Sequence, residues 1–110
     1  MIQILEEQLE RVQAACRRHG VLRLEVFGSA ADQKRFDPRQ SDIDFIVTFS
    51  SGVDLGPWMK TYFDLREELQ SVLARPVELV MESAMRDPFF RQEANRTREL
   101  IYGVAKPEAA

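Results

Sequence analysis

The sequence predicts an α/β (α+β) domain in which a small mixed sheet is flanked by helices. Segments with apolar residues at helical spacing are interspersed with short segments of strand type, in the order helix, strand, strand, helix, strand, helix, without an internal repeat. The chain has 110 residues, of which 45% are hydrophobic and 30% are charged. This length and composition suit one hydrophobic core, and the chain is too short to form two.

The first helix is expected over residues 2–19, where apolar residues recur at spacings of three and four. Acidic residues early in the segment and basic residues late in it suit the helix dipole, and Gly20 can adopt the left-handed conformation that ends a helix. Residues 21–27 are expected to follow as a strand. Their alternation puts three apolar residues on one face: Leu22, Leu24 and Val26.

A polar loop is expected over residues 30–40, with a short helical turn after Gly28 and Ser29. The second strand is expected over residues 42–49. Alternation gives it two different faces, one with Ile43, Phe45, Val47 and Phe49 and the other with Asp42, Asp44, Ile46 and Thr48.

The second helix is expected from Leu55 to Val72, because apolar residues again recur at helical spacing. Arg75 and Pro76 break this pattern, and the short apolar segment 77–81 is expected to be a third strand. Periodicity places most of the aromatic side chains in the core, and those that a small domain cannot bury would form a partner surface: Trp58, Tyr62, Phe63, Phe89 and Phe90.

The last helix is expected to begin with Asp87 as its N-cap and Pro88 at its first position. The aspartate side chain can accept a hydrogen bond from the first turn, and the fixed φ of proline suits that turn. The helix is expected to run to about Tyr102 and to be closed by Gly103.

Composition excludes several function classes. The chain has 15 Lys and Arg against 18 Asp and Glu, and a net charge of −3 argues against strong binding to duplex nucleic acid. We expect a cytoplasmic protein, because no apolar run approaches the ~20 residues of a membrane-spanning helix and the acidic N-terminus is unlike a signal peptide. The single Cys16 excludes an internal disulfide and a structural zinc site, and His19 is expected to cap the first helix or lie on the surface. The domain is expected to comprise residues 1–104, with a frayed tail at 105–110.

Asp42 and Asp44 are the residues best suited to carry chemistry. Two carboxylates on one strand face repel each other unless a cation lies between them, and Mg²⁺ prefers such hard oxygen donors beside a polyphosphate. An Asp-x-Asp pair also arises by chance at strand starts. Upstream, Gly28 would let a phosphate approach the backbone, and the Ser29 hydroxyl and the following amides could hold a phosphate oxygen, although an ordinary turn can have the same Gly-Ser sequence.

Together these residues form a recognisable pattern. Phe27-Gly28-Ser29, followed after twelve residues by Asp42-Ile43-Asp44, resembles the signature of the DNA polymerase β-type nucleotidyltransferase superfamily. The small size resembles its minimal nucleotidyltransferase (MNT) branch, and the resemblance extends over nearly the whole chain. It implies the polymerase β-like nucleotidyltransferase fold for the predicted domain.

The resemblance also implies a role for each motif residue. Gly28 and Ser29 would bind the triphosphate of ATP, and Asp42 and Asp44 would bind two Mg²⁺ ions. The family has a third carboxylate on a neighbouring strand, which helps to hold metal and to activate the acceptor hydroxyl. Glu78 is the candidate, because it lies in the third predicted strand and points away from the apolar face of that strand. Cross-strand neighbours lie about 4.5 to 5.5 Å apart, close enough to share a metal ion.

Three features depart from the family pattern. Glu78 stands where an aspartate is common, and the spacing between Ser29 and Asp42 is longer than the most frequent one. Residues 30–33 (Ala-Ala-Asp-Gln) lack the basic residue that usually follows the Gly-Ser pair. Basic residues of the longer loop could reach the phosphates or remain solvated: Lys34, Arg35 and Arg39.

The resemblance implies a partner as well. MNT proteins are typically encoded beside a HEPN-domain protein, an RNase-like toxin, and transfer AMP from ATP to a tyrosine hydroxyl of it. This chain would then be the antitoxin of a type VII-like toxin–antitoxin pair and would form a hetero-oligomer with the toxin. The alternative is a catalytically inactive MNT-like antitoxin that neutralises its partner by binding alone. The departures at residues 30–33 and at Glu78 favour this alternative, whereas the intact motif residues favour the enzyme: Gly28, Ser29, Asp42 and Asp44. Transferases that modify tRNA or antibiotics usually carry additional substrate-binding domains, for which 110 residues leave no room.

Overall fold

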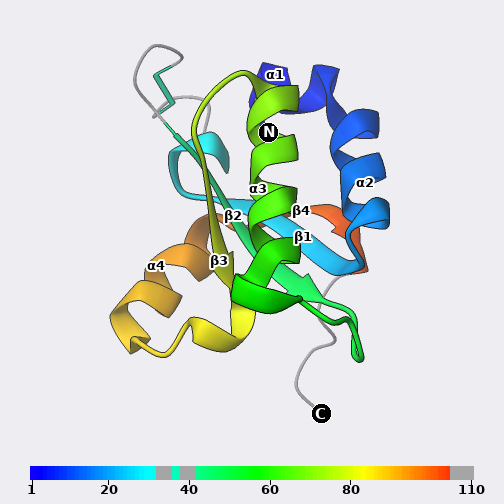
Figure 1. Cartoon of the computed structure of the whole chain (residues 1–110). Coiled ribbons are helices and arrows are strands. Elements are labelled where there is room, and N and C mark those ends of the chain that lie inside the picture. The colour runs from blue at the N-terminus through cyan, green and yellow to red at the C-terminus, as the bar shows by residue number, and fades with distance from the viewer. Residues whose placement is uncertain (32–35, 38–41, 105–110) are drawn as a thin grey trace.

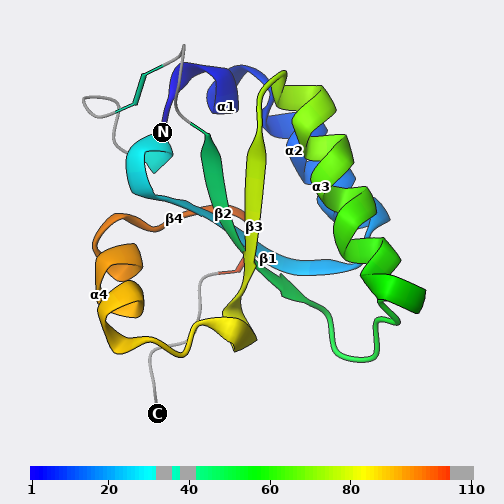
Figure 2. The same cartoon turned by 60° about the vertical axis from the view of Figure 1, so that its left-hand side comes forward.

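The structure, a computed structural model, describes residues 1–31, 36–37 and 42–104. Within these residues, four strands form one mixed sheet in the order β3-β2-β1-β4, with helices on both faces (Figures 1 and 2). The strands are β1 (Val21–Phe27), β2 (Ile43–Phe49), β3 (Val77–Met81) and β4 (Glu99–Gly103). The helices are α1 (Gln3–Glu7), α2 (Leu9–Arg18), α3 (Lys60–Leu73) and α4 (Pro88–Thr97), and the 3₁₀ turns are η1 (Gly28–Ala31), η2 (Pro57–Met59) and η3 (Glu82–Ala84).

The sheet separates two apolar clusters. α2 and α3 lie on one side of it and α4 lies on the other, as the two views show together (Figures 1 and 2). The larger cluster lies on the α2 and α3 side, where Leu24, Phe45 and Leu69 are fully buried. The smaller cluster lies on the α4 side and includes Phe27 and Ile46. Neighbouring residues of one strand thus serve different layers, as the two-residue period of a strand requires.

Three strands lie where alternation of apolar residues predicts them. β1 and β3 match residues 21–27 and 77–81, and β2 begins one residue later than expected, at Ile43. β1 and β2 are antiparallel, whereas β2 and β3 are parallel because the chain crosses back along α3 between them. The predicted mixed sheet flanked by helices is therefore confirmed.

The prediction of one last helix up to Tyr102 is wrong. Asp87 caps α4 as expected, because its side chain accepts a hydrogen bond from the Phe89 N–H at 2.9 Å. The helix, however, ends at Thr97. The following residues form β4, which pairs antiparallel with β1 and buries Ile101. This pairing satisfies backbone groups of β1 that would otherwise be left at an open edge, and a short apolar run does not by itself distinguish helix from strand.

The expected helix over residues 2–19 is divided into α1 and α2 by a single residue. Gln8 has φ −105° and ψ 13°, outside the helical range. Hydrogen bonds nevertheless continue through it, because its N–H donates to the Ile4 carbonyl and its own carbonyl accepts from Val12, both at 3.0 Å. The apolar spacing is therefore preserved across the break. Gly20 ends the segment with φ +70°, as predicted.

Some apolar side chains that were expected in the core are exposed. Leu22 is 45% exposed because a bulge between Val21 and Arg23 shifts the register of β1 against β2. Trp58 is 93% exposed because it precedes the start of α3 at Lys60 and has a left-handed backbone. The other four aromatic side chains divide between the exposed Phe63 and Phe89 and the half-buried Tyr62 and Phe90.

Side chains cover carbonyl groups of both edge strands. On β3, the Tyr62 hydroxyl donates to the Leu79 carbonyl and Arg66 Nε donates to the Val77 carbonyl at 3.1 Å. On β4, Gln13 Nε2 donates to the Ile101 carbonyl at 3.0 Å. Occupied edge carbonyls give a further strand less to pair with, so both edges are protected against strand addition. No helix among the described residues has the length and hydropathy to span a bilayer.

Gly103→Ala is expected to lower the free energy of unfolding by about 3 kcal/mol. Gly103 has φ +92°, and a Cβ there would lie 2.1 Å from the Leu22 carbonyl oxygen, a backbone atom that cannot move without disturbing the pairing of β1 with β4. Gly52→Ala is the matched control, because Gly52 has φ +84° with nothing within 4 Å of the added Cβ. Urea unfolding measures both, and equal losses would contradict the close approach at Gly103.

Candidate active site

The sheet register brings two of the predicted carboxylates together. Asp44 pairs with Phe27 of β1 on one side and with Glu78 of β3 on the other. A side-chain hydrogen bond joins Asp44 to Glu78. Asp42 stands just before β2, with its side chain exposed. All three therefore lie where β2 and β3 begin, two on adjacent strands and one on the approach to β2.

The Gly-Ser turn lies at the same end of the sheet. Gly28 follows β1 with φ +72°, and a Cβ built on it would lie 3.4 Å from Asp44 Oδ2. A side chain at this position would have to adopt a disfavoured backbone conformation directly beside a carboxylate. Ser29 follows, half-buried in η1, which lies beside the start of β2 in both views (Figures 1 and 2). The turn thus leaves the space in front of Asp44 free of side-chain atoms from residue 28.

Negative charge accumulates at this end of the sheet. The pKa of Asp44 is raised from 3.8 to about 6, first by burial, then by the negative charges of Glu78 and Asp42, and then by the hydrogen bond with Glu78. Each of these causes disfavours the ionised carboxylate. A bound cation would relieve the repulsion, because it would favour the ionised form of the same groups.

The carboxylates fit an open Mg²⁺ site rather than a closed one. Across residues 1–31, 36–37 and 42–104, no three acidic, histidine or cysteine side chains converge into a group that could hold a metal ion alone. Asp42 and Asp44 nevertheless supply the hard oxygen donors that Mg²⁺ prefers, and Mg²⁺ usually takes only one or two protein carboxylates and completes its coordination with phosphate oxygens and water. Burial raises the pKa of Asp44 most, and the negative charges of Glu78 and Asp42, which a bound cation would offset, raise it further.

Asp44→Asn is expected to stabilise the protein at neutral pH when a chelator removes divalent cations. The pKa of Asp44 is higher in the folded protein, about 6, than its ordinary value of 3.8, so the folded state binds the proton more tightly. The stability from this group is complete below pH 3.8 and is lost as the pH rises through about 6. Asp44→Asn removes this loss of stability at high pH. The control is Asp64→Asn, on α3 beside Lys60, and it is expected to retain the loss. Urea unfolding at about pH 4 and about pH 8 measures the difference, and an equal decline in all three proteins would contradict it.

Two pockets open at this end of the sheet, one beside the carboxylates and one beside Gly28. One, of about 340 Å³, has Asp42 and Glu78 in its wall together with Tyr62 and Arg66 of α3. The other, of about 510 Å³, lies between Gly28 and α4 and is lined by Phe27, Gly28, Phe90, Glu93, Ala94, Arg96 and Thr97. The site therefore has room for ligand atoms on two sides, one beside the paired carboxylates and one beside the Gly-Ser turn.

Arg66 and Arg96 each line one of these pockets, and nothing in the sequence pattern indicates either residue. Both arginines lie on helices far along the chain from the motif, among other charged residues with no distinguishing spacing. The sequence-based candidates for phosphate-binding cations were instead loop residues. These lie outside the described residues: Lys34, Arg35 and Arg39.

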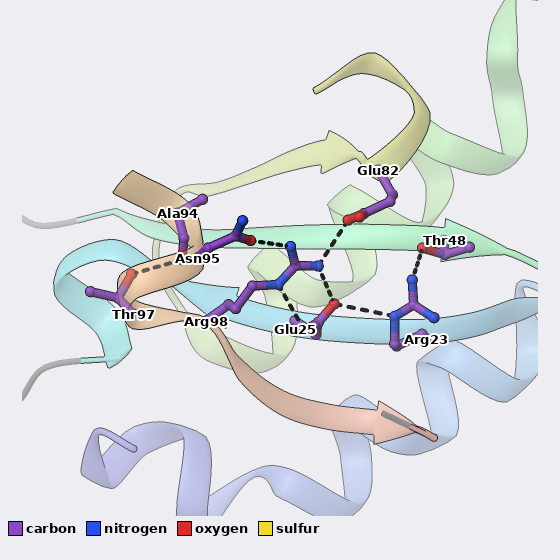
Figure 3. A network of polar contacts seen from close by, with 8 residues as sticks. All are labelled: Arg23, Glu25, Thr48, Glu82, Ala94, Asn95, Thr97 and Arg98. Atoms are coloured by element: carbon purple, nitrogen blue, oxygen red, sulfur yellow. Dashed lines mark hydrogen bonds and ion pairs between the residues drawn. The ribbon is translucent and has the colours of Figure 1, made fainter. Parts of the chain in front are cut away.

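A network of buried ion pairs fixes the end of α4 to the sheet (Figure 3). Arg98, the residue after α4, donates to both carboxylate oxygens of Glu25 on β1, at 2.9 and 2.6 Å, and to Glu82 of η3 at 2.9 Å. Arg23 donates to Glu25 at 3.2 Å and to Thr48 of β2 at 3.1 Å. The network thus connects four elements on the face of the sheet that α4 covers.

The other chemically versatile residues lie apart from this site. Cys16 is fully buried in the larger cluster, and burial raises the pKa of its thiol to about 12, so it is expected to be unreactive. His19 is the C-cap residue of α2, and its Nε2 lies 3.6 Å from Glu68 Oε1 on α3. The position of His19 agrees with the capping role that the sequence predicts for it.

Comparison with known proteins identifies relatives of this arrangement. Residues 10–106 match the polymerase beta nucleotidyltransferase family. A solved structure assigned to a minimal nucleotidyltransferase has 30% sequence identity and a TM-score of 0.68, with 86% of this chain and 90% of that chain covered. No curated protein matches the chain.

Two toxin–antitoxin structures share the fold at lower identity. A chain of a toxin–antitoxin complex with AMP-PNP has 20% identity and a TM-score of 0.62, covering 90% of this chain and 73% of that chain. A chain of the Shewanella oneidensis complex between a tri-AMPylated HEPN toxin and its MNT antitoxin has 18% identity and a TM-score of 0.61, with coverage of 90% and 72%. The fold expected from the Gly-Ser and Asp-x-Asp motifs is therefore confirmed.

Proposed function

Because the chain belongs to the polymerase beta nucleotidyltransferase family, we propose that it transfers AMP from ATP to a hydroxyl group of a partner protein. The observation that carries this proposal is that Gly28 lies beside Asp44, which in turn pairs with Glu78, at one end of the sheet. A phosphate-binding turn beside paired carboxylates suits phosphoryl chemistry on a nucleotide, in which charge must be neutralised and the reacting groups aligned.

The motif residues divide the work of binding ATP. Ser29 and the backbone after it hold the triphosphate, and Gly28 leaves space for it beside Asp44. Asp42 and Asp44 would hold two Mg²⁺ ions, with Glu78 as a further ligand. Bound Mg²⁺ would neutralise the charge that develops on the α-phosphate and on the leaving pyrophosphate.

The transfer step forms one bond and breaks one. The acceptor oxygen attacks the α-phosphorus of ATP, an O–P bond forms, and the bond to the oxygen that bridges to the β-phosphate breaks. Pyrophosphate leaves with the electron pair of that bond. Glu78 takes the proton of the acceptor hydroxyl, and its place beside the pocket lined by Tyr62 and Arg66 suits this role.

The partner is a HEPN toxin, the modified group is a tyrosine hydroxyl, and the chain acts as the antitoxin within a hetero-oligomer. Two comparisons support this part of the proposal. A related fold occurs in a complex that contains a tri-AMPylated HEPN toxin and an MNT antitoxin, and another occurs in a toxin–antitoxin complex with AMP-PNP.

A second candidate is an antitoxin that acts by contact alone. The observations that favour it are that Ala30 and Ala31, rather than a basic residue, follow the Gly-Ser pair, and that Glu78 stands where the family commonly has an aspartate. Mg²⁺-dependent stabilisation distinguishes the two candidates. An active site raises the melting temperature when ATP and Mg²⁺ are added together, and a vestigial site leaves it unchanged.

Position-specific labels on ATP test the reaction class. Incubation of the chain with Mg²⁺, its partner and α-³²P-ATP is expected to label the partner, whereas γ-³²P-ATP leaves it unlabelled because the γ-phosphate departs with pyrophosphate. Label from both positions would indicate transfer of more than the AMP group, and label from the γ-position alone would indicate a kinase. Either of these results would contradict nucleotidyl transfer.

A further inference from the structure

The N–H of Gly28 is already occupied by a side chain from α4. It donates to Thr97 Oγ1 at 2.8 Å, across a separation of 69 residues. The same hydroxyl donates in turn to the Ala94 carbonyl at 3.3 Å, so its orientation is set from both sides (Figure 3). The Gly-Ser turn is thus attached to the end of α4 by a hydrogen bond between two elements that are far apart in the chain.

Thr97 has little freedom to move. The preceding turn of α4 is packed into the smaller cluster, where Ala94 is only 2% exposed. The next residue, Arg98, is fixed by its ion pairs with Glu25 and Glu82, and its side chain is 16% exposed (Figure 3). The hydroxyl that receives the Gly28 N–H is therefore held between a packed helix and a buried ionic network.

We propose that Thr97 is a positioning residue for the nucleotide, which holds the peptide of Gly28 so that the turn keeps its open side toward Asp44. The inference rests on the proposed function. It follows that Gly28 contributes by its lack of a side chain and by its left-handed φ, rather than by donating its own N–H to phosphate. Phosphate contacts then fall to Ser29 and the groups that follow it.

Thr97→Val tests this inference, because valine keeps the shape of threonine and removes the hydroxyl. Isothermal titration with AMP-PNP and Mg²⁺ is expected to show about tenfold weaker binding, the effect of one hydrogen bond that orders the site. Thr97→Ser restores the hydroxyl and is expected to restore affinity. Thr61→Val is the matched control, since Thr61 Oγ1 also donates to a backbone carbonyl, that of Asp54 at 3.3 Å, but lies near the start of α3.

A merely structural role for Thr97 predicts a different pattern. Thr97→Val and Thr61→Val would then lower the melting temperature and leave nucleotide affinity unchanged. Affinity of Thr97→Val equal to or tighter than that of the wild type would overturn the inference, because it would mean that a freed Gly28 N–H serves the phosphate better. A crystal structure of the wild type with Mg²⁺ and AMP-PNP tests the inference independently. If the Gly28 N–H donated to a phosphate oxygen instead of to Thr97 Oγ1 in that structure, the inference would also be overturned.

The same titrations separate this inference from the proposed function. A wild-type chain that binds AMP-PNP with the expected dependence on Thr97, but labels no partner, would retain the positioning role and contradict the transfer. A wild-type chain that binds no nucleotide would overturn both.

Discussion

Asp42→Asn and Asp44→Asn are each expected to reduce AMP transfer about a thousandfold or more, to background, because each removes a charge that holds Mg²⁺ against the triphosphate. Asparagine has the shape of aspartate, and neither carboxylate belongs to an apolar cluster, so the fold is expected to persist. Transfer of α-label to the partner measures the loss, and circular dichroism checks the fold.

Asp64→Asn is the control for these two variants. Asp64 is a carboxylate on α3 that pairs with Lys60 at 2.6 Å, outside the candidate site. It is expected to retain full transfer. Turnover like that of the wild type in either Asp42→Asn or Asp44→Asn would remove the basis for assigning the site.

Arg98→Met is expected to lower the free energy of unfolding by about 3 kcal/mol or more, because it removes the guanidinium that bonds to two largely buried carboxylates. The side chains of Glu25 and Glu82 are 11% and 16% exposed, and Arg98 bonds to both. Arg23 remains beside Glu25 at 3.2 Å but contacts it through a single nitrogen. Methionine keeps most of the length of the arginine stem, so the loss reports the charge rather than the packing.

Arg96→Met is the control on the same helix. The Arg96 side chain is 71% exposed, and it pairs with Glu93 at the surface. Solvent weakens such an ion pair, so we expect it to contribute about 0.5 kcal/mol to the free energy of unfolding. Urea unfolding of both variants gives the comparison. If Arg98→Met lost no more stability than Arg96→Met, the network would be a surface feature and could not hold the end of α4 against β1.

Local patterns were sufficient for the strands that build the site. Alternation along residues 21–27 and 77–81 gave both strands their observed bounds, because each has one face in the larger cluster. The same alternation placed Asp44 and Glu78 on one face of the sheet, and the parallel pairing of β2 with β3 then made them neighbours. The Gly-Ser and Asp-x-Asp spacing identified the fold family, since these residues lie next to one another in the folded chain.

Features that depend on distant pairing were not predictable from the sequence. β4 is a strand because β1 offers it an edge, and its five residues have no pattern that separates it from the end of a helix. Leu22 is exposed because β1 has a bulge between Val21 and Arg23. No local feature of the sequence marks the position of this bulge. Thr97, Arg66 and Arg96 reach the site from helices that only tertiary packing brings there.

Intact-mass analysis of the partner tests the central claim most directly. The chain is incubated with ATP, Mg²⁺ and the protein encoded beside it, and the masses of both chains are compared with those from a reaction containing Asp42→Asn. AMP transfer predicts that the partner gains one or more AMP units with the wild type and none with the variant. An unchanged partner mass, in a stable complex of the two proteins, would contradict the transfer and establish an antitoxin that acts by contact alone.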